Sequence, residues 1–150
     1  MLRRQLADSG YARCVEDRPA RPSDIEEIAM ALPETEFGTS WGDRPTYKVR
    51  GRGFIIYRGP RKDAIDPDTG EPMDDVIVFW VPDEAAKTAL VEDNSPFFTI
   101  PHFDRTRAVL MRARDLGQIS RSELAEVITE GWLSMAPKKL ARQVTDALGE

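Results

Sequence analysis

Apolar residues recur at intervals of three or four positions in three segments of the chain, which predicts three helices that each have one apolar face. The first follows Ser23, which opens a capping-box pattern, and it ends before Pro33. The second follows Ser120, which opens the same pattern, and Pro137 separates it from the last helix. A further short helix is expected over residues 82–93, because a proline and two acidic residues favour a helix start there.

Between the first helix and Ser120 the pattern is largely that of strands. Residues 46–59 are rich in β-branched and aromatic residues, and Gly51 and Gly53 interrupt them, which predicts a hairpin. Residues 59–75 contain many Pro, Gly and polar residues, which is typical of a long loop. Further strands are expected at residues 76–80, 97–101 and 108–113.

This order of elements predicts a single α+β domain. Strands that follow one another in sequence, with helices at both ends, favour a mostly antiparallel sheet that packs with the N-terminal and C-terminal helices in two layers. The folded domain is assigned to residues 23–150. Residues 1–22, which end in Arg-Pro-Ala-Arg-Pro and show no sustained period, are interpreted as an N-terminal extension.

Composition and charge narrow the class of protein. The formal net charge of −5 disfavours a generic nucleic-acid coat protein, because phosphate contacts by Lys and Arg supply most non-specific affinity. The segment 42–62 nevertheless holds seven Lys and Arg residues against Asp43 alone, so one surface is expected to be basic. The only cysteine, Cys14, and the only histidine, His102, cannot build a Cys/His zinc site. No apolar run has the length of a membrane span, and the cytoplasm is the expected location, with no membrane partner.

Four short motifs carry a family resemblance. The chain resembles the YjbR/MmcQ-like family in the order and spacing of GTSWGDRPTYKVRGRGF, FFTIPHF, AVLMRA and GWLSMAPKKL. The match covers residues 23 to about 143. The resemblance implies a two-layer α+β fold of the CyaY-like type, together with the family's nominal label of DNA-binding protein.

Individual positions carry over from the family motifs to this chain. Two departures affect the possible contact loops: Asp43 and Arg44 lengthen the link before Pro45, and the segment after Phe103 lacks an aromatic residue often found there. The match to the family's first hairpin consists of Trp41, Pro45, Lys48 and Phe54. The match to its proline-histidine step consists of Pro101 and His102, and the match to its terminal helices consists of Trp132, Pro137 and Lys138.

The leading hypothesis is a non-enzymatic module that binds DNA through the phosphate backbone. If residues 46–50 form a strand, Lys48 and Arg50 project to one face, and Arg52 lies at the turn. Arg105 and Arg107 supply a second basic loop. The alternative is a charged strand face that meets only water.

The second hypothesis is a pocket for a small anionic or aromatic ligand. Its members offer aromatic, cationic and titratable groups, and they are Trp41, Lys48, His102, Trp132 and Lys138. Aromatic residues in strands and on helix stripes more often build the core, and Trp80 is assigned to packing on this ground. No serine, cysteine or carboxylate stands at a recognised spacing from His102, so no catalytic residue, metal or cofactor is assigned.

The third hypothesis is a protein-interaction adaptor. Its cues are the long loop at residues 59–75 and the extension at residues 1–22. The family resemblance supports neither the length of this loop nor the extension.

Overall fold

The sheet of this protein is built from strands that are neighbours in sequence. The computed structural model describes residues 17–40, 42–92 and 95–149. The strands are β1 (Thr35–Ser40), β2 (Arg44–Val49), β3 (Arg52–Arg58), β4 (Val76–Trp80) and β5 (Ala108–Arg112). They pair antiparallel in the order β1-β2-β3-β4-β5, so no connection crosses the sheet. The predicted α+β class with an antiparallel sheet is confirmed, and the CyaY-like assignment stays a prediction.

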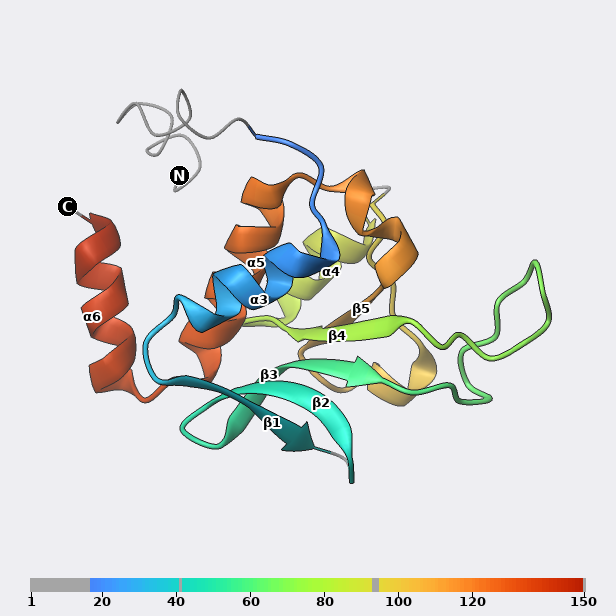
Figure 1. Ribbon diagram of the computed structural model, residues 1–150, viewed down its shortest axis with the longest axis horizontal. Helices are drawn as coiled ribbons and strands as arrows, with labels where there is room; N and C mark the ends of the chain where they lie inside the picture. The colour runs from blue at the N-terminus through green and yellow to red at the C-terminus, as the bar shows by residue number, and fades with distance from the viewer. Residues whose placement is uncertain (1–16, 41, 93–94, 150) are drawn as a thin grey trace.

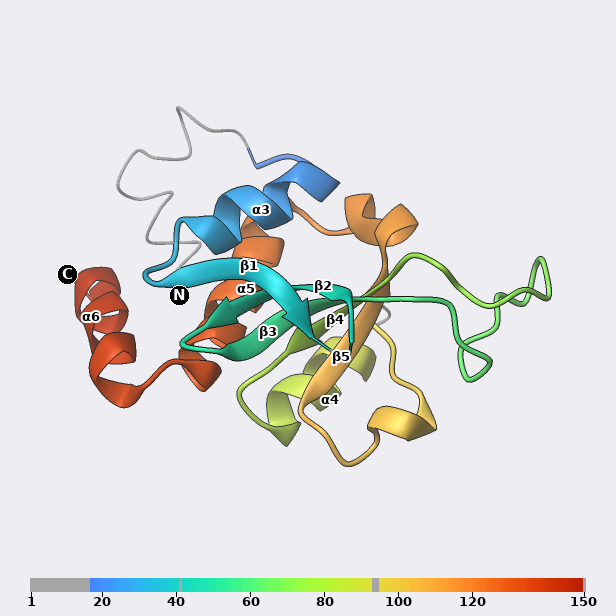
Figure 2. The same cartoon turned by 60° about the horizontal axis from the view of Figure 1, so that its bottom comes forward.

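A pair of packed helices forms a layer on one side of this sheet. The helical elements are α3 (Pro22–Met30), α4 (Glu84–Glu92), η1 (Pro101–Phe103), η2 (Ala113–Gln118), α5 (Arg121–Met135) and α6 (Lys138–Gly149). Helix α3 contacts α5, and α5 packs across β3 and β4 (Figure 1). Helix α4 contacts β5, and α6 stands beside the sheet rather than over it (Figure 2). Among the helices of the described residues, none combines the length and the apolar character needed to cross a membrane.

Apolar side chains cover both faces of the central strands. The main core, on the side of α3 and α5, contains Ile77 and the fully buried Trp132. A smaller cluster on the opposite face contains Val78, Leu110 and Phe103 of η1. The apolar run of β4 is unbroken because both of its faces are buried. The sequence predicted helices over one face, and this second cluster, completed by η1, was not predicted.

Helix α3 begins two residues before the predicted start. The backbone N–H of Arg21 donates to Asp24 Oδ2 at 2.8 Å, whereas Ser23 and Glu26, the predicted capping pair, are exposed. Asp24 takes the capping role because its carboxylate is fully buried and also accepts two hydrogen bonds of 2.8 Å from Arg18. The predicted Ser-Glu capping pair is therefore wrong.

The described part of the predicted extension packs on the domain. The N–H of Ala20 donates to the carbonyl of Ile119 at 2.9 Å, and the N–H of Arg121 donates to the carbonyl of Arg18 at 2.8 Å. Residues 17–22 thus lie against the start of α5. Residues 1–16 lie outside the described residues, and the boundary at residue 23 stays a prediction.

The segment at 97–101 is not a strand. Phe98 exchanges two backbone hydrogen bonds of 2.8 Å with Leu110, and this single bridge is its only pairing in the described sheet. Pro96 lies two residues before Phe98 and has no N–H to donate, so the ladder cannot extend in that direction. The sequence predicted the correct position for this pairing but a longer strand than the structure has.

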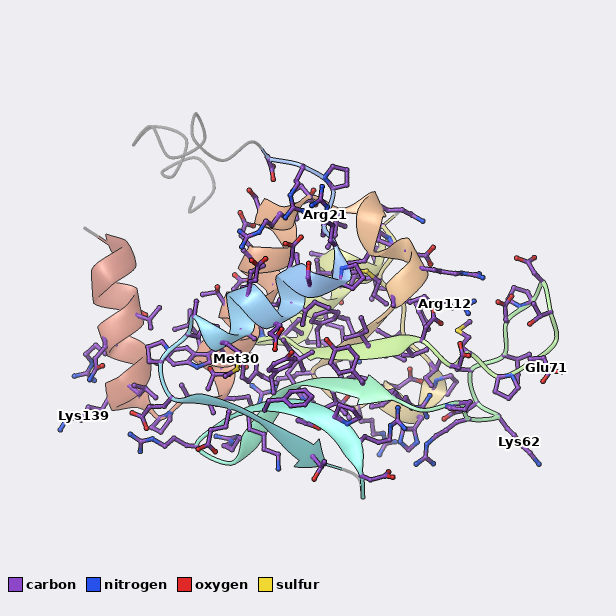
Figure 3. The ribbon with its side chains drawn as sticks, viewed as in Figure 1. Arg21, Met30, Lys62, Glu71, Arg112 and Lys139 are labelled. Carbon is purple, nitrogen blue, oxygen red and sulfur yellow. The ribbon has the colours of Figure 1, made fainter. Side chains whose placement is uncertain are left out.

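The loop at residues 59–75 protrudes from the sheet and is anchored at its base. Arg112, the last residue of β5, donates from Nη1 to Asp66 at 2.6 Å and from Nε to Asp75 at 2.8 Å. The hydrogen bond from Arg112 is the main reason that the pKa of Asp66 is lowered. Figure 3 shows Arg112 at the base and Glu71 on the protruding part. The predicted loop is confirmed, and its anchor is a contact between distant segments.

Candidate functional site

A tight hairpin joins β2 and β3, the strands that carry Lys48 and Arg52. Val49 pairs with Arg52, so the turn consists of Arg50 and Gly51 alone. Both have positive φ angles, 51° and 82°, which is the geometry of a type I′ hairpin turn. Glycine adopts this region without steric cost, which explains its use at the second position.

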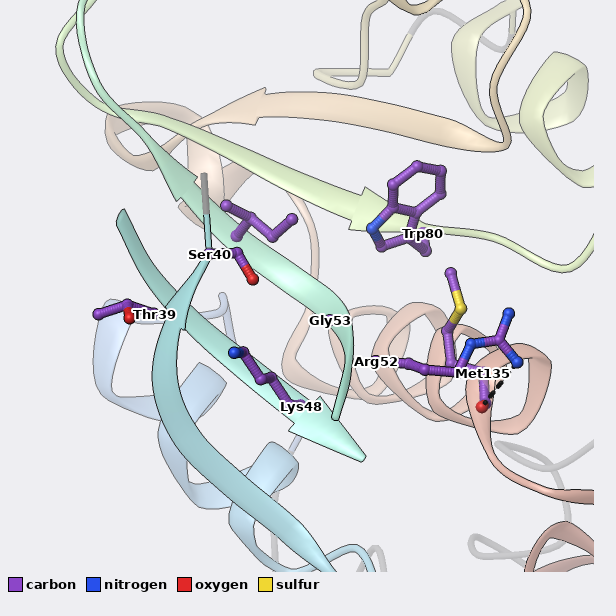
Figure 4. Close-up of a pocket in the computed structure, with 8 residues that line it drawn as sticks. Thr39, Ser40, Lys48, Arg52, Gly53, Trp80 and Met135 are labelled. Atoms are coloured by element: carbon purple, nitrogen blue, oxygen red, sulfur yellow. Dashed lines mark hydrogen bonds between the residues drawn. The ribbon is translucent and has the colours of Figure 1, made fainter. Parts of the chain in front are cut away.

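The open face of the sheet beside this hairpin contains a groove of about 490 Å³. Two cationic side chains and an aromatic ring line it, and no acidic residue does so among the residues that the structure describes. Figure 4 shows these side chains rising from the strands and from the end of α5. The lining residues are Thr39, Ser40, Lys48, Arg52, Gly53, Ile56, Trp80 and Met135.

A β-bulge in β3 places Lys48 opposite a residue that has no side chain. Tyr47 pairs with Ile55 and Lys48 pairs with Gly53, so Phe54 is the extra residue and turns into the main core. A Cβ atom on Gly53 would lie 2.8 Å from the Thr46 Cγ2 atom. The glycine therefore lets Thr46 pack closely and leaves the floor of the groove open beneath Lys48.

The C-terminal end of α5 forms one wall of the groove. Arg52 Nη1 donates to the carbonyl oxygen of Met135, the last residue of α5, at 3.4 Å. A cation at this position is favourable because helix C-termini carry partial negative charge. Lys48, by contrast, lies opposite Glu36 in the pairing of β1 with β2 and lines the groove.

Close contact between α5 and β4 fixes this wall. A Cβ atom on Gly131 would lie 2.5 Å from the carbonyl oxygen of Trp80, so only glycine permits the observed crossing. We expect Gly131→Ala to lower the free energy of unfolding by about 1 to 3 kcal/mol, because the helix must move away from the strand. Urea denaturation measures this loss.

The matched control for this variant is Gly117→Ala. Its added Cβ would have its nearest neighbour at 3.9 Å, which is ordinary van der Waals contact. Equal stabilities of the Gly131 and Gly117 variants would show that the close crossing does not constrain α5.

The predicted nucleic-acid residues do not lie on one surface strip. Lys48 and Arg52 line the groove, whereas Arg50 turns away and pairs with Glu34, with 2.9 Å between Nη2 and Oε2. The hydrogen bond from Arg50 lowers the pKa of Glu34. The alternation expected for Lys48 and Arg50 fails because β2 ends at Val49, and Arg50 already belongs to the turn.

The second predicted basic loop lies at the same end of the sheet as Arg52. Trp80 pairs with Ala108, so Arg107 directly precedes the strand that lies beside the groove's aromatic wall. Arg107 Nη1 donates to the carbonyl oxygen of Pro82 at 3.1 Å, and Arg105 is exposed in the preceding turn.

The structure does not gather the predicted pocket residues. Trp132 has an exposed fraction of 0% and donates from Nε1 to the Pro33 carbonyl oxygen at 3.2 Å, so it is a core residue and cannot contact a ligand. His102 lies on η1 and lines a different cavity from Lys48. Lys138 is exposed at the first position of α6 and does not line the groove. Trp41 lies outside the described residues.

Trp80 is the aromatic residue of the groove, and the sequence analysis did not predict it as a ligand contact. It was assigned to packing, and its side chain is in fact half-buried, with one part against the apolar clusters and another in the groove. The signal available in the sequence was the even spacing of Trp80 from Val76 and Val78, because alternate residues of a strand lie on the same face, here of β4. Its place as the last residue of the strand was the second signal.

Comparisons with known proteins assign this chain to a family. The model of the YjbR family matches residues 30–134. An uncharacterised protein of Mycobacterium tuberculosis and one of Mycobacterium bovis are each 44% identical to this chain over 120 residues, which cover 79% of this chain and 91% of each relative. No solved structure gives a significant match.

Proposed function

The chain belongs to the YjbR family, and we propose that it is a non-enzymatic binding module that holds a small anionic ligand with an aromatic part in the groove of its sheet. The observation that carries this proposal is the convergence of Lys48, Arg52 and Trp80 on one groove. The three residues come from three different strands, and the antiparallel pairing brings them together.

The dimensions and chemistry of the groove support this class of ligand. Its volume of about 490 Å³ falls in the range of small-molecule sites, which extends from about 300 to 1,000 Å³. Lys48 and Arg52 supply donors for an anionic group, and hydrogen bonds to charged groups contribute about 1.5 to 3 kcal/mol each. The Trp80 ring offers an apolar surface on which a flat ring can stack.

A titration with three matched ligands tests the proposal. Adenosine monophosphate carries both an anion and an aromatic ring, adenosine lacks the anion, and inorganic phosphate lacks the ring. In ¹H–¹⁵N correlation spectra we expect adenosine monophosphate at millimolar concentration to shift the amide signals of Thr39, Lys48 and Gly53 more than either of the other two. Absence of a shift at these amides with adenosine monophosphate would contradict the proposal.

Removal of a positive charge from the groove is expected to weaken ligand binding. We expect Lys48→Ala and Arg52→Ala each to weaken binding of adenosine monophosphate about tenfold, because each removes a charge-assisted hydrogen bond. Lys62→Ala is the matched control, since Lys62 is an exposed cation on the protruding loop (Figure 3). Equal weakening by all three variants would indicate a general charge effect instead of a groove.

Nucleic-acid binding is the second candidate function. The observation that favours it is that Arg52, Trp80 and Arg107 lie at one end of the sheet, so cations flank an aromatic ring that could stack on a base. The net charge of −5 and the pairing of Arg50 with Glu34 weigh against an extended duplex contact. A single strand fits this surface better than a duplex does.

Fluorescence polarisation separates the two candidates. A labelled single strand and a labelled duplex are titrated at low and physiological salt, with the wild-type protein and with Arg105→Ala. The nucleic-acid function predicts binding that weakens with salt and with loss of Arg105, which lies outside the groove. Tight adenosine monophosphate binding without oligonucleotide binding would leave only the groove function.

Two earlier expectations stay predictions. An adaptor role would use the loop at residues 59–75, whose protruding shape is compatible with a partner contact. A cytoplasmic location is likewise a prediction from the sequence.

A further inference from the structure

A second cavity lies on the same face of the sheet, and we propose that it is a separate binding site for a phosphate monoester. Its volume is about 350 Å³, and it is lined by Arg58, Arg61, His102 and Phe103. Phe103 belongs to the same apolar cluster as Ile56, which lines the groove described above. The two sites therefore share one face of the sheet but have different side chains.

Arg58 is the fixed element of this site. It ends β3 with an exposed fraction of 3%, its guanidinium carbon lies 5.4 Å from the centre of the Phe103 ring, and Nη2 donates to Asp63 Oδ2 at 2.7 Å. The hydrogen bond from Arg58 is the main reason that the pKa of Asp63 is lowered. Asp63 thus remains ionised and holds the guanidinium in one orientation.

The other N–H groups of Arg58 have no acceptor among the described residues. A guanidinium has five N–H donors, and Asp63 is the only acceptor for this one among the described residues. Among the described residues, the fully buried side-chain polar atoms without a partner are the hydroxyls of Thr35 and Thr99. The unpaired donors of Arg58 are not among these atoms, so they retain contact with solvent. The cavity that Arg58 lines provides this contact.

His102 and Arg61 supply the remaining donors from two other segments. The His102 ring meets the Phe103 ring edge-on, with 4.9 Å between the centroids and an angle of 87°. Their turn is held by Lys87, whose buried ammonium donates to the carbonyl oxygens of Phe103 at 2.6 Å and Thr106 at 2.7 Å. Arg61 is exposed on the loop that follows β3. The donors thus come from a strand, a loop and a short helix.

The donor set fits a phosphate monoester better than a carboxylate. Arg58 and Arg61 carry two positive charges, and Asp63 offsets one of them, so the cavity favours an anion. A phosphate monoester has three free oxygens for the three donor side chains, whereas a carboxylate or a phosphodiester has two. Arginine suits this role because its planar fork binds phosphate oxygens in pairs.

This site is independent of the groove and is tested separately. The probes are inorganic phosphate, dimethyl phosphate as a diester, and acetate, each titrated into the full chain while the amide signals of residues 58–63 and 101–103 are followed. We expect inorganic phosphate to bind about tenfold more tightly than the other two, because it has enough free oxygens to meet all three donor side chains, whereas dimethyl phosphate and acetate have two each. Equal binding of dimethyl phosphate or acetate would overturn the assignment to a monoester.

Variants locate the binding on the proposed residues. Arg61→Ala combined with His102→Ala should weaken phosphate binding about tenfold or more. The double variant should still fold, because both side chains are exposed. Lys139→Ala, another exposed cation, should have no effect. Lys48→Ala should leave phosphate binding at this cavity unchanged, which distinguishes it from the groove. Unchanged binding in the double variant, or shifts confined to other residues, would overturn the proposal.

Discussion

Replacing Trp132 with alanine is expected to lower the free energy of unfolding by about 3 to 5 kcal/mol, the usual cost of deleting a buried tryptophan. The indole has an exposed fraction of 0% and lies in the main core between α5 and the sheet. Its Nε1 also donates to the carbonyl oxygen of Pro33 at 3.2 Å, so the same side chain ties α5 to the end of the α3 segment. Native domains are stable by about 5 to 15 kcal/mol, and this single loss is a large part of that total.

Urea denaturation followed by far-ultraviolet circular dichroism measures the effect. Trp80→Ala is the informative comparison, because Trp80 is half-buried and lines the groove. It should cost less stability than Trp132→Ala but weaken binding of adenosine monophosphate. If the Trp132→Ala variant were nearly as stable as the wild type, or lost binding while keeping its stability, Trp132 would be a ligand-contact residue after all.

Replacing Asp24 with alanine is expected to cost about 3 kcal/mol, because loss of one partner of a buried ion pair leaves the other charge uncompensated. The Asp24 carboxylate has an exposed fraction of 0%, accepts hydrogen bonds from Arg18 and from the N–H of Arg21, and lies 3.3 Å from Arg121 Nε. Its removal disconnects residues 17–22 from α5 and also removes the cap of α3. The figure is at the lower end for buried pairs because both arginines are partly exposed.

The Asp24 contribution depends on pH in a defined direction. The pKa of Asp24 is held far below its usual value, mainly by the hydrogen bonds from Arg18, with smaller effects from the Arg21 N–H and the Arg121 charge, while burial opposes the shift. A carboxyl whose pKa is lowered by folding stabilises the fold above its unfolded pKa of about 3.9, and the stabilisation is lost as the pH falls below that value.

Unfolding free energies measured at several pH values test this direction. We expect the difference between wild type and Asp24→Ala to be constant above about pH 5 and to shrink as the pH approaches 2. Asp74→Asn, at an exposed carboxylate, is the control and should follow the wild-type curve. A difference that stays constant down to pH 2, or grows, would show that Asp24 is not stabilised as a carboxylate.

Local patterns in the sequence were sufficient for most of the secondary structure. Helix α5 begins at the predicted Ser120 and Glu123, whose capping box is present, and the hairpin turn uses the predicted Gly51. These features depend on neighbouring residues only, because a cap or a two-residue turn is satisfied within a few positions. The start of α3 was mispredicted because its cap, Asp24, is selected by Arg18 and Arg121, and Arg121 is 97 residues away in sequence.

In the candidate sites, too, local sequence features predicted some of the residues, and contacts between distant segments decided the rest. Lys48 and Arg52 were predicted as binding residues from the sequence, because charge is a local property, and the structure places both in the groove. Sequence could not show that Arg50 pairs with Glu34 or that Trp132 is buried, because both outcomes depend on which segments meet in space. Nor could it show that His102 shares a cavity with Arg58.

The sequence alone determined the α+β class and the antiparallel character of the sheet, because helix period, strand period and turn residues are local features of the chain. The resemblance of its short motifs was sufficient to predict the family. The tertiary structure decided which of the basic and aromatic residues are available to a ligand. A bulge at Phe54 and the contact at Gly131 assemble the groove around Lys48, Arg52 and Trp80. Burial and proximity are properties of the packed chain, and no local pattern contains them.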